Sequence, residues 1–197
     1  MKVLSGGKLA GGNPKGERVT HDFYATDPKA LKMLMEEYQF NEGSFLEPCV
    51  GNGNLANIIK DEFPGSEITC IDIVDRGYPN TIIHDFLTWE TDEKFDNIIT
   101  NSPYSIAKEF VEKGLSLLDE GGKMAMFLKV QFLEGMKRQL MFEKYPHKYM
   151  YVFTKRMPTW KNGQPKDENG KKWATTMCHA WFIWEKDSKA EPIIRWL

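Results

Sequence analysis

The chain has 197 residues, of which 41% are hydrophobic and 27% charged, and this composition excludes a disordered or fibrous protein. Its net charge of −2 argues against a protein that coats nucleic acid with its whole surface, but not against a local basic patch. Three scattered cysteines, Cys49, Cys70 and Cys178, favour neither a disulfide framework nor a metal site, and no segment approaches the roughly 20 apolar residues of a membrane helix.

We therefore expect a soluble, cytoplasmic protein that binds no metal and does not enter a membrane. Residues 1–20 are predicted to be a flexible basic arm, because they are rich in glycine, lack periodicity and carry four basic side chains against one acidic. Residues 21–197 are expected to form one domain with its own core. Its first helix is predicted to begin near Pro28, with Thr26 or Asp27 as the cap, and to end before Gly43.

From residue 44 onwards, strand-like runs alternate with helical patterns. The expected strands cover residues 44–49, 67–73, 81–86, 95–100 and 123–129, and the expected helices cover residues 55–63 and 106–118. Such alternation is typical of a parallel sheet with helices on both faces. The predicted fold is thus α/β, with a doubly wound, mainly parallel, Rossmann-like sheet of about seven strands.

The last fifty residues have a different pattern. Two strand-like runs, residues 148–155 and 176–185, are predicted to form an antiparallel C-terminal hairpin joined by a long polar loop, residues 156–175. Between Lys155 and Lys172 six basic residues face two acidic ones. On charge alone this pattern favours a solvated hairpin tip, but the basic loop is also the best candidate for contact with a polyanion.

A glycine-rich loop follows the expected strand at residues 44–49. Gly51 and Gly53 would let the backbone approach a ligand, and the next helix would present free N–H groups to it. The spacing also satisfies a loose dinucleotide fingerprint, with Asp72 placed to take ribose hydroxyls. No dehydrogenase-like residues follow, however, and Glu47 would repel phosphates and suit a cationic group. We predict an adenosyl ligand that carries a positive group.

The tetrapeptide Asn101-Ser102-Pro103-Tyr104 follows the expected strand at residues 95–100. An aromatic amine is a poor nucleophile because its lone pair is delocalised into the ring. The Asn101 side-chain carbonyl and the Ser102 backbone carbonyl could accept its two N–H groups and localise that pair, and Tyr104 could stack on a base turned out of its helix. Alone, such a tetrapeptide is more often a turn, but its place after the glycine loop favours catalysis.

Together these motifs resemble class I S-adenosylmethionine-dependent methyltransferases, and within them the small phage-type DNA adenine methyltransferases, over roughly residues 23–184. The matching segments are residues 47–53, Asp72, residues 85–86 and residues 101–104, and residues 22–28 resemble the segment beside the methionine end of the cofactor. The resemblance implies S-adenosylmethionine as cofactor and methylation of the adenine amine in DNA. The implied catalytic residues are Asn101, Ser102, Pro103 and Tyr104.

By the same resemblance, Asp72 would hold the cofactor's ribose, Asp85 its adenine amine, and Phe86 would pack on its adenine ring. The implied cofactor-binding residues are Tyr24, Thr26, Glu47, Pro48, Gly51, Gly53, Asp72, Ile73, Asp85 and Phe86. Candidate contacts with substrate phosphates are Lys129, Arg138, Arg156 and Lys161. Little chain remains to recognise base edges, so we expect short sequence specificity or a specificity partner, and a monomer or weak dimer.

One position departs from the family pattern, because Ser102 stands where the family usually has a proline. The position contributes its backbone carbonyl, so serine need not abolish activity. The alternatives that stay open are methylation of RNA adenine or of a protein glutamine amide, and a module that binds S-adenosylmethionine without catalysis. Cys49 is expected to be buried packing, and Trp181 and Trp184 are expected to fill the core.

Overall fold

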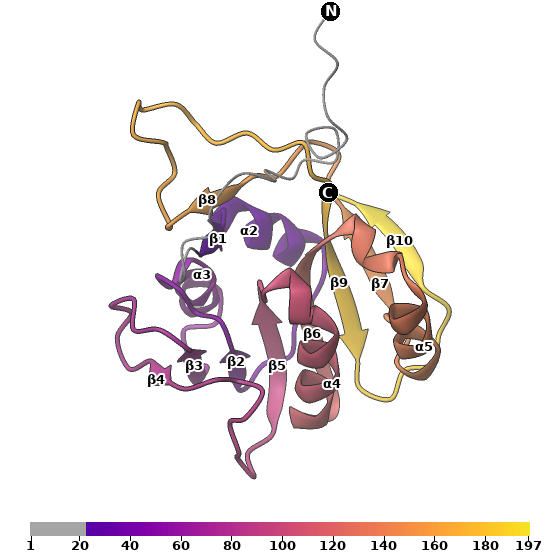
Figure 1. Cartoon of the computed structure of the whole chain (residues 1–197). Helices are drawn as coiled ribbons and strands as arrows, with labels where there is room; N and C mark the ends of the chain where they lie inside the picture. The colour runs from indigo at the N-terminus through magenta and orange to yellow at the C-terminus, as the bar shows by residue number, and fades with distance from the viewer. Residues whose placement is uncertain (1–22) are drawn as a thin grey trace, which may run out of the picture.

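The structure is a computed structural model, and it describes residues 23–197; the predicted basic arm, residues 1–20, lies outside the described residues. A central sheet has the strand order β10-β7-β9-β6-β5-β2-β3-β4 (Figure 1). Its strands are β2 (Phe45–Glu47), β3 (Ile68–Asp72), β4 (Ile82–Ile83), β5 (Phe95–Thr100), β6 (Leu118–Lys129), β7 (Tyr149–Val152), β9 (His179–Glu185) and β10 (Ile193–Trp196).

Strand direction divides this sheet. Neighbours from β4 to β6 run parallel, whereas β9 runs antiparallel to both β6 and β7. At the edge, β10 is parallel to β7. The predicted mainly parallel sheet with an antiparallel C-terminal pair is therefore confirmed, and β10 is an additional strand that the sequence pattern did not reveal.

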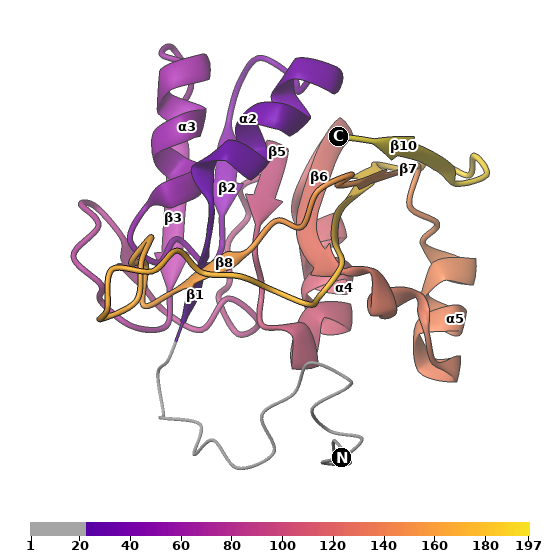
Figure 2. The same ribbon diagram turned by 90° about the horizontal axis from the view of Figure 1, so that it is seen from above.

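Helices cover both faces of the sheet, as Figure 2 shows from above. One face carries α2 (Pro28–Glu37) and α3 (Asn54–Glu62), and the other carries α4 (Ala107–Leu117) and α5 (Met136–Lys144). Short 3-10 helices, η1 (Tyr104–Ile106) and η2 (Val130–Leu133), follow β5 and β6. Each face of the sheet is covered by its own cluster of buried apolar side chains. The fold thus has three layers, helices, sheet and helices, with a hydrophobic core on each side of the sheet.

The helix starts and the core agree with the sequence in several details. The side chain of Asp27 accepts a 3.0 Å hydrogen bond from the backbone N–H of Lys29 and caps α2, with Pro28 in its first turn. Trp181 and Trp184 fill the core as expected. Their indole N–H groups donate to the backbone carbonyls of Ala30 and Tyr145 at 2.9 and 3.0 Å, so the buried rings leave no donor unpaired.

Other boundaries differ from the prediction. β6 begins at Leu118, whereas we expected residue 118 to end the preceding helix. Leu118 pairs with Phe95, the chain then bulges through the glycines, and Lys123 rejoins the sheet opposite Asn97. The strand expected at residues 81–86 is reduced to the two residues of β4.

A two-stranded ribbon lies apart from the central sheet, and nothing in the sequence pattern predicted it. It pairs β1 (Tyr24–Thr26) with β8 (Thr159–Lys161) in antiparallel register, so that Tyr24 lies opposite Lys161. In Figure 1 this β1–β8 ribbon lies above the upper end of α3. The basic loop therefore does not project freely from the hairpin, because its first part is paired with the N-terminal strand.

Candidate active site

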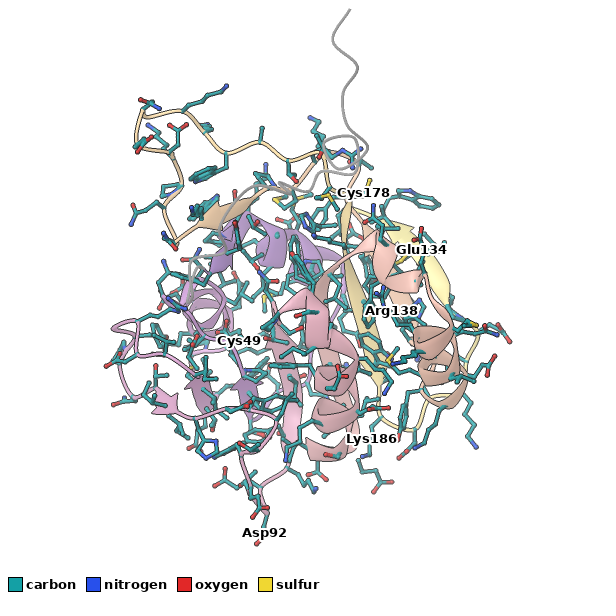
Figure 3. The ribbon with its side chains drawn as sticks, in the orientation of Figure 1. Cys49, Asp92, Glu134, Arg138, Cys178 and Lys186 are labelled. Atoms are coloured by element: carbon teal, nitrogen blue, oxygen red, sulfur yellow. The ribbon has the colours of Figure 1, made fainter. Side chains whose placement is uncertain are left out.

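The predicted site residues gather where β2, β3, β4 and β5 end. Because parallel strands end at the same edge of a sheet, the loops that follow them converge there. Figure 3 labels Cys49, two residues beyond β2, in the middle of the molecule below the β1–β8 ribbon. Its thiol is half-buried beside Thr100, and burial raises its pKa, so the expectation of a packed cysteine agrees with its environment.

The glycine loop after β2 adopts a conformation that requires glycine. Gly51 and Gly53 have φ angles of 57° and 83°, in the left-handed region that side chains disfavour. A Cβ atom on Gly53 would lie 2.0 Å from the ring of Tyr78. Gly53 is also the N-cap of α3, so the loop brings the N-terminal end of that helix to the same strand edge.

Asp72, the last residue of β3, holds this loop in place. Its Oδ2 accepts a 2.8 Å hydrogen bond from the backbone N–H of Gly51, and its Oδ1 accepts one of 3.0 Å from Val74. An ionised carboxylate has about four acceptor sites, so Asp72 retains capacity to accept ligand hydroxyls as well. The structure therefore gives Asp72 a second task, shaping the glycine loop, that the sequence did not reveal.

Exposed groups lie beyond Asp72 along the ends of β3 and β4. The Ile73 side chain is 66% exposed, an unusual position for an apolar residue at a strand end, and it offers a flat apolar contact for a ring. Asp85 is exposed, and its Oδ1 accepts a 2.9 Å hydrogen bond from the backbone N–H of Leu87. Its Oδ2 is left for a ligand. Phe86 differs from the expectation: it is 3% exposed and packs on Phe110 with ring centroids 4.9 Å apart, so its ring belongs to the core.

Glu47 is a buried acid with an unsatisfied oxygen. The residue is 1% exposed, and its Oε2 has no hydrogen-bond partner. Burial raises the pKa of this carboxyl well above its usual range, although the backbone N–H of Ala56 opposes the shift. A buried acceptor without a partner is costly, and a cationic or hydrogen-bond-donating ligand would relieve that cost.

The tetrapeptide after β5 is held by the β1–β8 ribbon. The Asn101 side-chain Nδ2 donates to the backbone carbonyl of Tyr24 at 2.8 Å, and this contact turns Oδ1 away from the carbonyl as a free acceptor. Ser102 is 2% exposed, and its Oγ has no partner. Thr26, also in β1, is 2% exposed with an unpartnered Oγ1. Buried polar oxygens that lack partners thus occur both in the tetrapeptide and in β1, the strand that contacts it.

Additional contacts fix the ribbon over the glycine loop. The Asn54 side chain donates to the backbone carbonyl of Thr26 at 2.9 Å, and the backbone N–H of Asn162 donates to Phe23 at 2.9 Å. Arg76 lies over the Phe23 ring at 4.1 Å from its centroid. Sequence reasoning assigned Tyr24 and Thr26 to cofactor binding but missed their strand partner, because a three-residue strand has almost no periodicity.

The predicted phosphate contacts do not all lie in the same part of the structure. Lys161 is in β8 of the ribbon, and Arg156 contacts the thiol of Cys178. A small cavity of about 130 Å³ is lined by both Lys129 and Arg138, together with Tyr104. Figure 3 shows Arg138 on the α5 side of the molecule, away from Cys49. Arg138 donates to the backbone carbonyl of Gln131 at 2.8 Å.

Within residues 23–197, no cluster of three or more histidine, cysteine or acidic side chains could hold a metal ion. Over the same residues, no helix has the length and hydropathy needed to cross a membrane.

The fold and the placement of the motifs define a class. A mainly parallel sheet with one reversed strand, β9, inserted between β6 and β7, and with a glycine loop after its first strand, is the arrangement of class I S-adenosylmethionine-dependent methyltransferases. The chain has this fold, and the predicted resemblance to class I S-adenosylmethionine-dependent methyltransferases is confirmed.

Particular proteins support this assignment, although no family model matches the chain. A segment is 36% identical over 99 residues to the Type II methyltransferase M.CvrRI of Paramecium bursaria Chlorella virus XZ-6E. The match covers 46% of this chain and 26% of that protein, so the chain spans about a quarter of its relative's length.

Solved structures agree on the fold at low sequence identity. A predicted O-methyltransferase from Agrobacterium tumefaciens has a TM-score of 0.61 at 13% identity, over 86% of this chain and 85% of that one. The methyltransferase subunit of a type I restriction-modification system from Streptococcus thermophilus has a TM-score of 0.61 at 14% identity, over 89% of this chain and 48% of that one. At such identities the likeness establishes the fold alone.

Proposed function

We propose that this protein transfers a methyl group from S-adenosylmethionine to the exocyclic amine of adenine in DNA. The observation that carries the proposal is the Asn101 side chain, whose Nδ2 is held by the Tyr24 carbonyl at 2.8 Å. That contact leaves Oδ1 available to accept an N–H of the target amine at the strand edge where the cofactor residues meet. The names of similar proteins, a Type II methyltransferase and a restriction-modification subunit, support DNA as the substrate.

The residues around the glycine loop fit the proposed cofactor. The unpartnered Oε2 of buried Glu47 suits the positively charged methionine part. Asp72 would accept hydrogen bonds from the ribose hydroxyls, and Asp85 would accept one from the adenine amine. The exposed Ile73 side chain would contact the adenine ring. When bound, S-adenosylmethionine supplies an electrophilic methyl group on its sulfonium.

The chain's own part in the reaction is to hold and orient the target amine. Asn101 Oδ1 and the backbone carbonyl of Ser102 would each accept one amine N–H, which localises the nitrogen lone pair. Tyr104 would stack on the flipped base and offset part of the unstacking free energy of a few kcal/mol. Alignment of the amine with the methyl group is then the main source of catalysis, since orientation can lower a barrier by roughly 7–11 kcal/mol.

Contact with the DNA backbone is assigned to the basic loop. Lys161 lies in β8, directly opposite Tyr24 of the ribbon that holds Asn101. Lys155 and Arg156 precede β8, and Lys166, Lys171 and Lys172 follow it, which supports contact of this loop with phosphates near the target base. Phosphate contacts of this kind give affinity without base specificity, and we propose low sequence specificity or a partner that supplies it.

The proposal is tested by incubation of the whole chain with methyl-labelled S-adenosylmethionine and one substrate at a time. The substrates are mixed-sequence duplex DNA, single-stranded DNA, RNA and protein extract, and each is digested and analysed by mass spectrometry. We expect labelled N6-methyladenine from DNA, and at least about 100-fold slower labelling with Asn101→Ala. Label in RNA or in glutamine would overturn the DNA assignment. Tight cofactor binding without transfer to any substrate would overturn the enzymatic function.

A further inference from the structure

The ring of Tyr104 is held by contacts from β6 and β9. Its hydroxyl lies 3.3 Å from Nε2 of His179, and the Nζ atom of Lys129 lies over its ring, 4.7 Å from the centroid. Burial raises the pKa of the Tyr104 phenol, so the hydroxyl stays protonated. It can therefore donate a hydrogen bond to the imidazole. Lys129 covers one ring face, so a base that stacks on Tyr104 would have to use the opposite face.

His179 is itself fixed from two directions. It is 4% exposed, its Nδ1 lies 2.9 Å from the backbone carbonyl of Met157, and its ring stacks on Phe127 with centroids 4.8 Å apart. Because Nδ1 must donate to that carbonyl, Nε2 of the neutral ring is an acceptor. Burial lowers the pKa of His179 to about 4, and the charges of Lys129 and Arg156 act in the same direction. The neutral acceptor form therefore persists at physiological pH.

We propose that His179 is a positioning residue, which holds Tyr104 in the orientation that stacks on the target base. The inference rests on the proposed function. Pairing of β6 with β9 places Lys129 directly opposite His179. This one residue pair therefore supplies both contacts with Tyr104: Lys129 covers its ring, and His179 binds its hydroxyl. The anchor fixes the ring by its hydroxyl, and a fixed ring loses less conformational entropy when the base stacks.

Two substitutions separate this role from simple packing. In His179→Gln the side-chain carbonyl lies about as far from the backbone as Nε2 does, so it can still accept a hydrogen bond from the Tyr104 hydroxyl. In His179→Asn the amide lies only as far from the backbone as Nδ1 does. It can therefore donate a hydrogen bond to the backbone carbonyl of Met157 but cannot reach Tyr104. Both variants lose the ring stacking on Phe127, which makes them matched controls for each other.

The expected result is a change in substrate affinity without a comparable change in turnover. For His179→Asn, KM for DNA should rise about fivefold to tenfold, as expected for one lost hydrogen bond that positions a stacking ring. Its kcat should stay within about twofold, because the contact serves bound substrate and transition state equally. His179→Gln should restore most of the affinity. Tyr104→Phe should raise KM as His179→Asn does, and the double variant should be no worse than either single one.

A spectroscopic measurement accompanies the kinetics. In the full chain, the 15N resonance of His179 Nε2 should shift in Tyr104→Phe and stay unchanged in the control Tyr24→Phe. Equal KM values for His179→Asn, His179→Gln and wild type, in an active enzyme, would overturn this inference alone. A wild-type chain that binds S-adenosylmethionine and methylates nothing would overturn the proposed function, and this inference with it.

Discussion

The two halves of the central sheet treat buried polar groups in opposite ways. In the half made by β6, β7 and β9, the N–H groups of Trp181, Trp184 and His179 all reach backbone carbonyls within 3.0 Å. In the half made by β2 to β5, Glu47 and Ser102 keep buried oxygens without partners. Native proteins satisfy most buried polar groups. The contrast teaches that the first half, apart from His147, has its buried polar groups paired as folded, whereas the other has places for a ligand's donors.

The largest expected effect is a loss of stability from a substitution in the half of the sheet made by β6, β7 and β9. Trp181→Ala should lower the free energy of unfolding by about 3–5 kcal/mol, because it empties a fully buried ring position and removes the indole hydrogen bond to the Ala30 carbonyl. Urea unfolding followed by circular dichroism measures the loss. Trp181→Phe, which keeps most of the volume, should cost less. A loss below about 1 kcal/mol for the alanine variant would contradict the packing described.

The next effect belongs to the ligand-ready half and should leave stability almost unchanged. Asn101→Ala should lower kcat for methyl transfer about 10²- to 10³-fold, the range found when one preorganised hydrogen-bonding group is removed from a site. The Kd for S-adenosylmethionine, measured by calorimetry, should change less than about twofold.

Asn101→Asp serves as the matched control for this prediction. It keeps an acceptor at the same position but cannot donate to the Tyr24 carbonyl, so its kcat should fall between those of the wild type and the alanine variant. An alanine variant with wild-type turnover would show that Asn101 does not hold the target amine.

A pH dependence sharpens the comparison, because His147 is the exception in the half made by β6, β7 and β9. It is 6% exposed, its Nδ1 has no partner, and burial lowers its pKa from 6.5 to about 4. The folded state then binds fewer protons than the unfolded state between these values. The stability that comes from the neutral ring is therefore present above pH 6.5 and is lost as the pH falls toward 4.

We expect this group to remove about 2 kcal/mol of stability between pH 7 and pH 5. His179 has the same shift and the same sign, whereas the raised pKa of Glu47 acts in the opposite direction. Urea unfolding at a series of pH values should show a flatter dependence for His147→Phe than for the wild type. An unchanged slope would mean that His147 does not contribute.

The smallest expected effect has opposite signs in the free and the bound protein. Glu47→Gln removes a buried acid, so the ligand-free melting temperature should stay the same or rise. The stabilisation by S-adenosylmethionine should fall by about 1–2 kcal/mol, because the amide attracts a cationic ligand less strongly. Thermal melts with and without the cofactor measure both quantities. Glu62→Gln, at an exposed position of α3, should change neither.

The sequence predicted the central sheet well because its signals are local. Strand β5 has the predicted bounds, and the glycine loop and Asn101 lie at the predicted strand edge. The β1–β8 ribbon was missed because short strands far apart in the chain show no periodicity that links them. The α5 helix was missed because it leaves Met136 and Leu140 exposed. Phe86 shows that a motif can fix the position of a residue without fixing which way its ring points.

The ribbon also sets the order in which the site can be assembled. All strands that carry the glycine loop and the acidic residues are synthesised before Asn101, yet the Tyr24 carbonyl that orients Asn101 lies in a strand whose partner is residues 159–161. Joining these ends closes a loop over most of the chain, which is an entropically costly and slow event in folding. During synthesis the glycine loop and the tetrapeptide therefore emerge well before the β1–β8 ribbon, whose Tyr24 carbonyl orients Asn101, can form.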